Sequence, residues 1–334
     1  MLVILGAGVY FFVFYEEENI FGDKEAGFAV KDTSEIGRLY LVRTNGTAID
    51  LKRTDSGWIV NDTYKARENT LKNLFWTLRT QFVQFPVPES AHNNAIKNLA
   101  SSSVKVEVYN RDGDRMRSFY VGNEAHGYSG SYMLMEGAKK PYVVQVPGVQ
   151  GFPTPFYTTS LKDWRDRGVF RFGKDNISHV TMRYANEPLN SFTVKQNGRV
   201  VVETEPGIAG TNPLNEKRAD AYLGFFSEIY CEGYMNGIPG LDSVIASADK
   251  YCSVEVLGKD NKRQQLDVYY MPINKRSKNL TSEEPSNYDP DRYYGVTNNY
   301  KDTVLMQHLT LEKLCRKAWE FYQPETQVTN PVAN

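Results

Sequence analysis

This chain of 334 residues has few cysteines and histidines, and its net charge is close to zero. The three cysteines, Cys231, Cys252 and Cys315, allow at most one disulfide, and no C-x-x-C pair indicates a zinc or redox site; we interpret them as buried structural thiols. The four histidines have no spacing typical of a metal site. The net charge of −1 gives no general attraction to nucleic acid. The sequence therefore predicts no metal, no cofactor and no nucleic-acid partner.

Complete catalytic motifs are missing as well. The early Gly6-Ala7-Gly8 would need a third glycine to bind a dinucleotide, and Phe11 stands at that position. A phosphate-binding G-x-x-x-x-G-K-[ST] motif does not occur. The stretch "GYSGS" ends in Ser131 where a nucleophile elbow needs glycine. We therefore expect a protein without enzymatic activity.

The long apolar stretch at the start of the chain, Leu2 to Tyr15, is uncharged and would cover about 21 Å as a helix, less than a bilayer core of about 30 Å. Acidic residues follow it at positions 16–18. We interpret residues 1–18 as part of an uncleaved transmembrane signal anchor whose complete form begins upstream of Met1. The alternative is a buried strand or helix. An anchor predicts a single-pass inner-membrane protein with most of its chain in the periplasm.

The remainder of the chain reads as two copies of one pattern. The clearest match sets "SVKVEVYNRDGDR" from Ser103 against "YCSVEVLGKDNKR" from Tyr251, 148 positions later. Apolar residues at helical spacing over 71–82 and 219–230 keep the same offset. Two insertions distinguish the second copy: a Gly/Pro-rich loop at 206–213 and the polar stretch "KRSKNLTSEEPSNYDPD". The sequence predicts repeat units at 19–167 and 168–323, followed by a disordered tail at 324–334.

The elements of each copy indicate an α+β fold. Short β-rich runs separated by turns predict a meander of antiparallel strands, with one or two helices packed on its apolar face. A further helix is expected over 311–321, at the end of the second copy. Any groove is expected between the two copies.

Two short stretches hold the residues most typical of a site. The loop "GNEAHGYSG" brings Glu124, His126 and Tyr128 close in sequence, and Ser129 would complete a hydrolase arrangement; an exposed loop is the alternative. In "KDWRDRGVF", Trp164, Arg165 and Arg167 could hold an anion. We favour the alternative, in which the alternating charges form ion pairs that fix the angle between the copies.

Several motifs together carry a family resemblance: "SGWIVNDTYKAREN", "PVP" at 86–88, "FYVGNEAHGYSGSYMLMEG", "KDWRDRGVF" and "PLNSFTV". With them the chain resembles domain-of-unknown-function family 4340, a group of membrane-anchored bacterial proteins, over about residues 28–321. Genes of that family are often found beside those of gliding-type ABC transporters. The resemblance therefore implies a transporter-associated role in the cell envelope, and it implies no catalytic residues.

Three functions follow as hypotheses. The first is a non-enzymatic, membrane-anchored interaction or scaffold module of an envelope complex, whose partners are other membrane-complex proteins. The second is a glycan- or lipid-binding module that uses a tyrosine-rich groove between the copies, since the chain has 22 tyrosines. The third is a hydrolase built on the loop of His126, Glu124 and Ser129.

Overall fold

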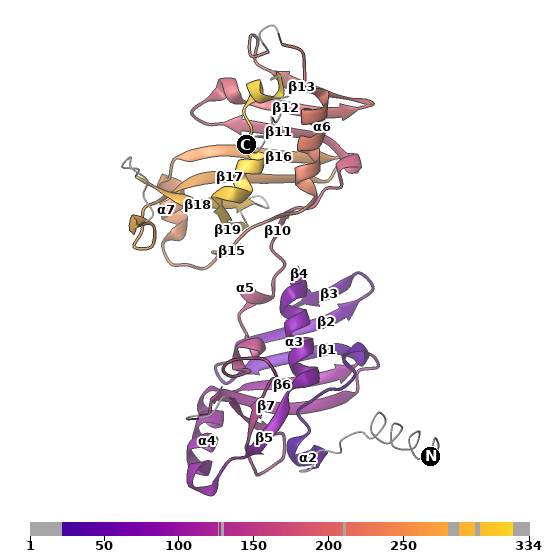
Figure 1. Ribbon diagram of the computed structural model, residues 1–334, viewed down its shortest axis with the longest axis vertical. Helices are drawn as coiled ribbons and strands as arrows, with labels where there is room; N and C mark the ends of the chain where they lie inside the picture. The colour runs from indigo at the N-terminus through magenta and orange to yellow at the C-terminus, as the bar shows by residue number, and fades with distance from the viewer. Residues whose placement is uncertain are drawn as a thin grey trace, which may run out of the picture. The chain divides into compact units, whose positions relative to one another are not determined.

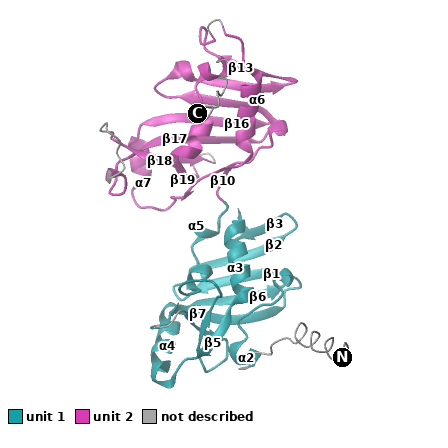
Figure 2. Ribbon diagram, in the orientation of Figure 1, with its two compact units in different colours: residues 1–166 teal, residues 167–334 magenta. Residues whose placement is uncertain are grey.

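The computed structural model describes residues 22–125, 127, 130–209, 212–279, 287–297 and 301–322. The chain divides between Asp166 and Arg167 into two compact units (Figure 2). The expected anchor at 1–18 and the expected tail at 324–334 lie outside the described residues. Within the described ranges, every helix is too short or too polar to cross a bilayer.

Unit 1 is built on one large antiparallel sheet (Figure 1). Its strands are β1 (Ile36–Arg43), β2 (Ala48–Thr54), β3 (Gly57–Val60), β4 (Tyr64–Lys65), β5 (Phe82–Pro86), β6 (Val104–Asn110), β7 (Arg115–Glu124), β8 (Ser131–Met135) and β9 (Tyr142–Gln145). Its helices are α2 (Asp23–Ala26), α3 (Glu68–Thr80), α4 (Glu89–Ser102) and α5 (Leu161–Trp164). The strand order is β4-β3-β2-β1-β6-β7-β8-β9-β5, with antiparallel neighbours throughout.

The path of the chain departs from a simple meander. Strands β1 to β4 run outward from the middle of the sheet, and α3 then returns the chain to the far edge, where β5 pairs with β9. Helix α4 leads back to the centre, so that β6 lies beside β1. The expected antiparallel α+β class is correct, and the connectivity is more complex because both helices carry the chain across the sheet.

Helices lie on both faces of this sheet. The predicted apolar stripe of α3, with Leu71, Leu74 and Leu78, is buried in the main core with β1 and β2. Ala95 and Leu99 of α4 belong to a separate cluster that contains Tyr132, whose neighbour Met133 faces the main core. Successive strand residues point to opposite faces, so the two helices cover different sides.

Helix α3 is shorter than its apolar pattern predicts, because the chain turns at Gln81. The Gln81 side chain is buried, donates to the Phe28 carbonyl at 2.6 Å and accepts from the Tyr157 hydroxyl at 2.6 Å. Phe82, predicted on the helix, instead begins β5 and is 46% exposed.

Unit 2 also contains one large antiparallel sheet. Its strands are β11 (Ile177–Tyr184), β12 (Phe192–Asn197), β13 (Arg199–Thr204), β15 (Gly233–Tyr234), β16 (Lys250–Gly258), β17 (Arg263–Pro272), β18 (Tyr288–Thr297) and β19 (Asp302–Gln307). A small second sheet pairs β10 (Gly168–Phe170) with β14 (Ile229–Tyr230). The helices are α6 (Glu216–Gly224), α7 (Leu241–Ser247) and α8 (His308–Leu314).

The strand order β13-β12-β11-β16-β17-β18-β19-β15 follows the same route as unit 1 from β3 to β5. The chain runs outward, returns through α6 to the far edge, and crosses through α7 to the centre. Both central pairs also carry a register shift, at Ile36/Arg38 in unit 1 and at Ile177/His179 in unit 2.

The C-terminal helix expected over 311–321 is divided in two. Helix α8 ends at Leu314, and a short 3₁₀ turn covers Ala318–Tyr322. The break is stabilised by tyrosine hydroxyls that occupy main-chain acceptors, since Tyr222 donates to the Leu314 carbonyl at 2.9 Å and Tyr184 to the Arg316 carbonyl at 2.8 Å. The second-copy helix is also shorter than expected, because α6 ends at Gly224 and Tyr230 lies in β14.

Gly37 lies at the register shift of unit 1, and its substitution is expected to lower stability. A Cβ at Gly37 would lie 2.6 Å from the Asn110 carbonyl oxygen and 2.7 Å from the Arg111 Cα, both main-chain atoms. Gly37→Ala is expected to lower the free energy of unfolding by about 1–3 kcal/mol in denaturant titrations. Gly173→Ala is the control, because its Cβ would meet only the Asn176 amide at 3.7 Å. Equal stability of the two variants would contradict the prediction.

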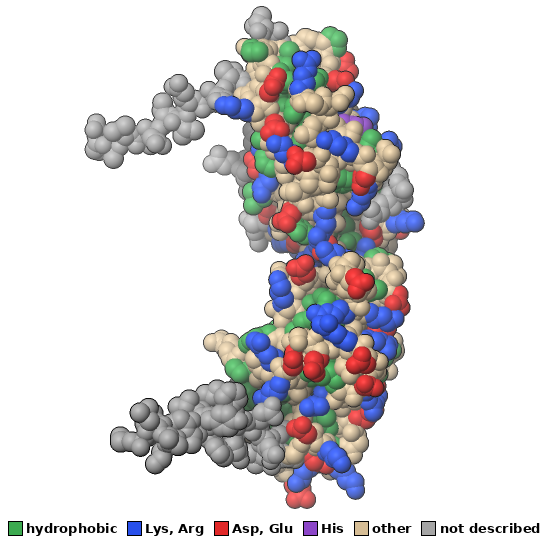
Figure 3. All heavy atoms as spheres, turned by 90° about the vertical axis from the view of Figure 1, so that its right-hand side faces the viewer, with side chains coloured by type: hydrophobic (Ala, Val, Ile, Leu, Met, Phe, Trp, Pro, Cys, Tyr) green, Lys and Arg blue, Asp and Glu red, His purple; other side chains and the backbone are tan. Residues whose placement is uncertain are grey.

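Charges of both signs intermix on the surface. Figure 3 shows acidic and basic side chains interspersed over the visible face of each unit, in keeping with the net charge of −1. The face drawn there therefore presents no broad field of one sign.

Candidate functional site: a tyrosine face on unit 2

Five tyrosines from four strands of unit 2 contact one another on one side of the sheet. We define the tyrosine face as Tyr184 (β11), Tyr251 (β16), Tyr270 (β17), Tyr288 and Tyr293 (β18). The Tyr270 ring is central, with centroid distances of 4.5 Å to Tyr288, 5.2 Å to Tyr251 and 5.7 Å to Tyr293. All except the buried Tyr184 are partly exposed.

Irregular strand register is what brings these rings together. Tyr288 and Tyr293 are five residues apart, and a regular strand would place them on opposite faces. Tyr270 pairs with Tyr293, while Pro272 pairs with Tyr288, so β18 carries extra residues between its two tyrosines. This bulge turns both rings toward Tyr270. A second register shift on β16, between Lys250 and Cys252, contains Tyr251.

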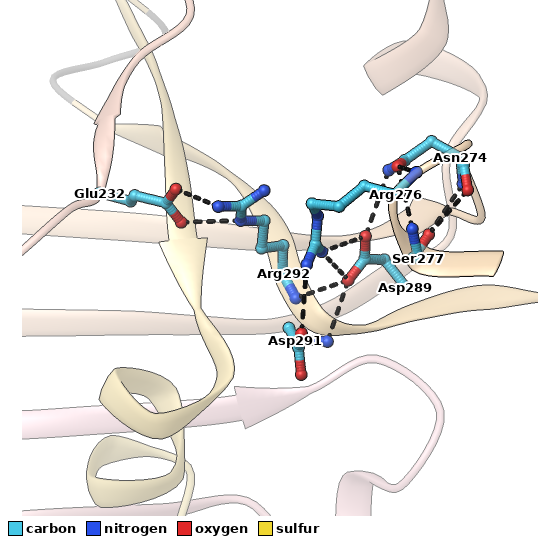
Figure 4. Close-up of polar contacts among 7 residues, drawn as sticks. All are labelled: Glu232, Asn274, Arg276, Ser277, Asp289, Asp291 and Arg292. Atoms are coloured by element: carbon cyan, nitrogen blue, oxygen red, sulfur yellow. Dashed lines mark hydrogen bonds and ion pairs between the residues drawn. The ribbon is translucent and has the colours of Figure 1, made fainter. Parts of the chain in front are cut away.

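A buried carboxylate builds the bulge in β18 (Figure 4). The Asp289 side chain is fully buried and accepts hydrogen bonds from the backbone N–H groups of Asp291 at 3.0 Å and Arg292 at 3.1 Å. The Arg276 guanidinium donates to both of its oxygens at 2.7 and 2.8 Å, and the Asn274 amide donates at 3.2 Å. These contacts connect Asn274 and Arg276, which follow β17, to the beginning of β18.

Arg292 extends this polar cluster to another part of unit 2. Its guanidinium binds Glu232 through two nitrogens, one of them at 2.8 Å, as Figure 4 shows. The Glu232 backbone N–H donates to the Leu305 carbonyl of β19. The bulge is therefore stabilised by Arg276 through Asp289 and by Glu232 through Arg292, and Tyr288 directly precedes Asp289.

Electrostatics keeps Asp289 ionised. Burial by itself would raise the pKa of the Asp289 carboxyl, but the backbone hydrogen bond from Asp291 and the ion pair with Arg276 outweigh it and lower the pKa. The carboxylate therefore remains a strong acceptor in the folded protein at neutral pH.

The phenols of the tyrosine face are neutral hydrogen-bonding groups. Burial raises the pKa values of Tyr184, Tyr251 and Tyr270, and it raises the pKa of Tyr293 to about 12. The hydrogen bond to Asp249 raises the pKa of Tyr288. Every ring thus carries an O–H group at neutral pH.

Polar groups border the rings. The Tyr288 hydroxyl donates to Asp249, and the exposed His308 ring stacks on Tyr293 with centroids 6.1 Å apart. The Lys317 ammonium lies 4.3 Å from the Tyr184 centroid and pairs with Glu187. The face thus combines apolar ring surface with hydroxyl, carboxylate, imidazole and ammonium groups.

The predicted loop site lies largely outside the described residues. His126, Tyr128 and Ser129 are not described, whereas Glu124 is an exposed residue at the end of β7, opposite Ser131. The loop site and its hydrolase alternative stay predictions.

The structure separates the residues of the "KDWRDR" stretch between the units. Trp164 is fully buried in the core of unit 1 and donates its indole N–H to the Thr158 carbonyl at 2.7 Å. Arg165 is also buried, with its guanidinium carbon 3.9 Å from the Tyr64 centroid. Arg167 belongs to unit 2, where its carbonyl accepts from the Cys231 N–H at 2.9 Å.

Two Tyr-Tyr pairs in the sequence indicate the tyrosine face, but regular strand alternation does not show which rings share a side of the sheet. The Tyr-Tyr pairs at 269–270 and 293–294 lie on neighbouring strands, and one member of each pair belongs to the opposite side of the sheet, where Tyr294 packs with α7. The tyrosine cluster lies within unit 2. Among the residues that the structure describes, no group of three or more acidic, histidine or cysteine side chains is placed to hold a metal ion.

The fold defines an α+β protein of two antiparallel-sheet units with helices on both sides of each sheet. A family model for a domain of unknown function, DUF4340, matches residues 58–243, more than half of the chain. The chain therefore belongs to that family. The match includes Tyr184 but ends before the other members of the tyrosine face. No curated protein and no solved structure has significant similarity to the chain.

Proposed function

We propose that this protein is a non-enzymatic binding module of the cell envelope whose tyrosine face holds a glycan. The observation that carries the proposal is the cluster of partly exposed rings centred on Tyr270 and bordered by hydrogen-bonding groups. Aromatic rings offer apolar faces, and tyrosine adds a polar hydroxyl at the edge. A pyranose has the matching arrangement, with C–H groups on its faces and hydroxyls around its rim.

The polar border favours a glycan over an acyl chain. Small-molecule sites combine a mostly apolar lining with a few polar groups that orient the ligand. Asp249 and His308 lie at the edge of the rings, where they can bond to sugar hydroxyls. An acyl chain would cover these groups without offering them any further hydrogen bond, which costs binding free energy.

Calorimetric titration of the full-length protein tests this proposal. The probe is a preparation of soluble peptidoglycan fragments, and vesicles of phosphatidylethanolamine and phosphatidylglycerol are the comparison. Saturable binding of the fragments without binding of the vesicles is the expected result. Binding of vesicles alone would replace the glycan with a lipid ligand, and binding of neither would reject the proposed function.

We also propose that the two units arose by duplication and that an N-terminal helix anchors them in the inner membrane, with the bulk of the chain in the periplasm. The matching strand order of the two sheets supports duplication. The apolar run from Leu2 to Tyr15 supports the anchor. Protease protection of spheroplasts tests the topology, since externally added protease should digest both units.

A scaffold role in a transporter-associated envelope complex is the second candidate function. Its support is membership in the family, which the sequence resemblance associates with gliding-type ABC transporters. Affinity purification from mildly solubilised membranes tests this role. Co-purification of other membrane proteins is expected, whereas recovery of the protein alone would count against it.

A further inference from the structure

We propose that Cys252 and Cys315 form a disulfide bond that fastens the C-terminal segment of unit 2 to its sheet. Their sulfur atoms lie 3.6 Å apart although the residues are 63 positions apart in sequence. Cys252 is fully buried on β16, and Cys315 is the half-buried residue that follows α8. This inference does not depend on the proposed glycan function.

Backbone pairing and hydrogen bonds fix both cysteines so that their sulfur atoms are in van der Waals contact. Cys252 pairs with Tyr184 on β11 and with Val268 on β17, so it lies in the interior of the sheet. The carbonyls on either side of Cys315 accept hydrogen bonds from Tyr222 and Tyr184. Bond formation needs an approach of about 1.5 Å, to a sulfur–sulfur distance of about 2.05 Å.

The chemistry is a thiol–disulfide exchange with an external disulfide, such as oxidised glutathione or the active-site disulfide of a thiol oxidase. The Cys315 thiolate attacks that disulfide, which releases one thiol and leaves a mixed disulfide. The Cys252 thiol then gives up its proton as its sulfur attacks the Cys315 sulfur, and the second thiol of the external disulfide leaves. Two S–H bonds are lost, one S–S bond forms, and the two electrons reduce the external disulfide.

The order of the two steps follows from exposure. The hydrogen bond to Cys315, together with burial, raises the pKa of the Cys252 thiol, which is therefore protonated at neutral pH. Cys315 is only half-buried, so it is the sulfur that first meets the oxidant.

The bond would stabilise a large part of the unit 2 core. The segment after β19 contributes Leu311, Leu314, Ala318 and Phe321 to the main core. Closing a loop of this length in the unfolded chain is expected to raise the melting temperature of unit 2 by about 5–15 °C in the oxidised protein relative to the reduced one.

Peptide mapping of the full-length protein provides the test. The protein is incubated with oxidised glutathione, denatured, alkylated and digested with trypsin under non-reducing conditions. Tryptic peptides 251–259 and 314–316 should appear as one linked species, and peptide 219–250 should carry an alkylated Cys231. Reduction before alkylation should separate the linked species.

Variants make the assignment specific. Cys252→Ser and Cys315→Ser should each abolish the linked species and the melting-temperature shift, whereas Cys231→Ser should retain both. Alkylation of all three thiols, a persistent glutathione adduct on Cys315, or a bond that includes Cys231 would each overturn the proposal. The mapping of the unmodified protein decides the outcome even if a variant does not fold.

One consequence rests on the proposed function. His308 and Lys317 lie on the fastened segment and border the tyrosine face. Reduction should therefore weaken glycan binding several-fold. A linked species without any glycan binding would sustain the disulfide and reject only the function.

Discussion

Tyr270→Ala is expected to weaken glycan binding by about 10- to 100-fold, which corresponds to about 1.4–2.7 kcal/mol. Its ring contacts those of Tyr251, Tyr288 and Tyr293, so its removal takes away the centre of the stacking surface and leaves its neighbours less well ordered. Tyr270→Phe keeps the ring and should retain most of the affinity. Calorimetric titration with soluble peptidoglycan fragments measures the change.

The neighbouring residue supplies a matched control for this prediction. Tyr269 lies on the same strand but on the opposite side of the sheet, where it packs against the cluster of Leu241 and Ile245 on α7. Tyr269→Ala therefore removes a similar ring from unit 2 without touching the tyrosine face. Equal loss of binding in Tyr269→Ala and Tyr270→Ala would show that the effect is one of stability.

Asp289→Ala is expected to lower the free energy of unfolding of unit 2 by about 2–4 kcal/mol. The substitution leaves the Arg276 guanidinium, the Asn274 amide and the two backbone N–H groups of the bulge without their common acceptor. This expected loss is smaller than the largest losses known for broken buried ion pairs, because the Arg276 side chain is 36% exposed and water can solvate it. Denaturant titration monitored by circular dichroism measures the loss.

Asp291→Ala is the control for Asp289. Its carboxylate is 56% exposed and contacts the same guanidinium at 3.2 Å, so its removal should cost about 0.5 kcal/mol or less. If the two variants lost equal stability, burial of Asp289 would not be the cause. Asp289→Ala should also weaken glycan binding, since the bulge positions Tyr288.

The same carboxylate predicts a pH dependence. The pKa of Asp289 is lower in the folded protein than the ordinary value of 3.8, as is that of the buried Asp267. Their contribution to stability is therefore complete above about pH 4 and is lost as the pH falls through the folded pKa values. Thermal unfolding between pH 2 and 6 should show this loss, and Asp289→Asn should reduce it. A loss that was unchanged in Asp289→Asn would contradict the assignment.

The sequence predicted the α+β class and antiparallel strands because alternating apolar residues and turn residues are local signals. It did not predict α4. Of the 14 residues of this helix only Ala95 and Leu99 are buried, which is too few to form a recognisable apolar stripe. It also missed the edge positions of β5 and β15, because pairing between distant strands depends on the completed sheet.

The tyrosine face could not be predicted from the alternation of residues along a strand. An odd spacing places Tyr288 and Tyr293 on opposite faces of any regular strand, and only the bulge around Asp289 reverses this. The bulge depends on Arg276, thirteen residues away. The sequence around each tyrosine therefore does not show which side of the sheet its ring occupies.

Nuclear magnetic resonance of the protein with isotope-labelled tyrosine rings tests the central claim most directly. On titration with soluble peptidoglycan fragments, we expect saturable shifts in the ring signals of Tyr251, Tyr270, Tyr288 and Tyr293, with Tyr269 and Tyr294 unchanged. Assignment follows from single Tyr→Phe variants. Shifts confined to tyrosines outside this face, or unchanged ring signals at saturating fragment concentration, would contradict the claim that the tyrosine face of unit 2 is the ligand site.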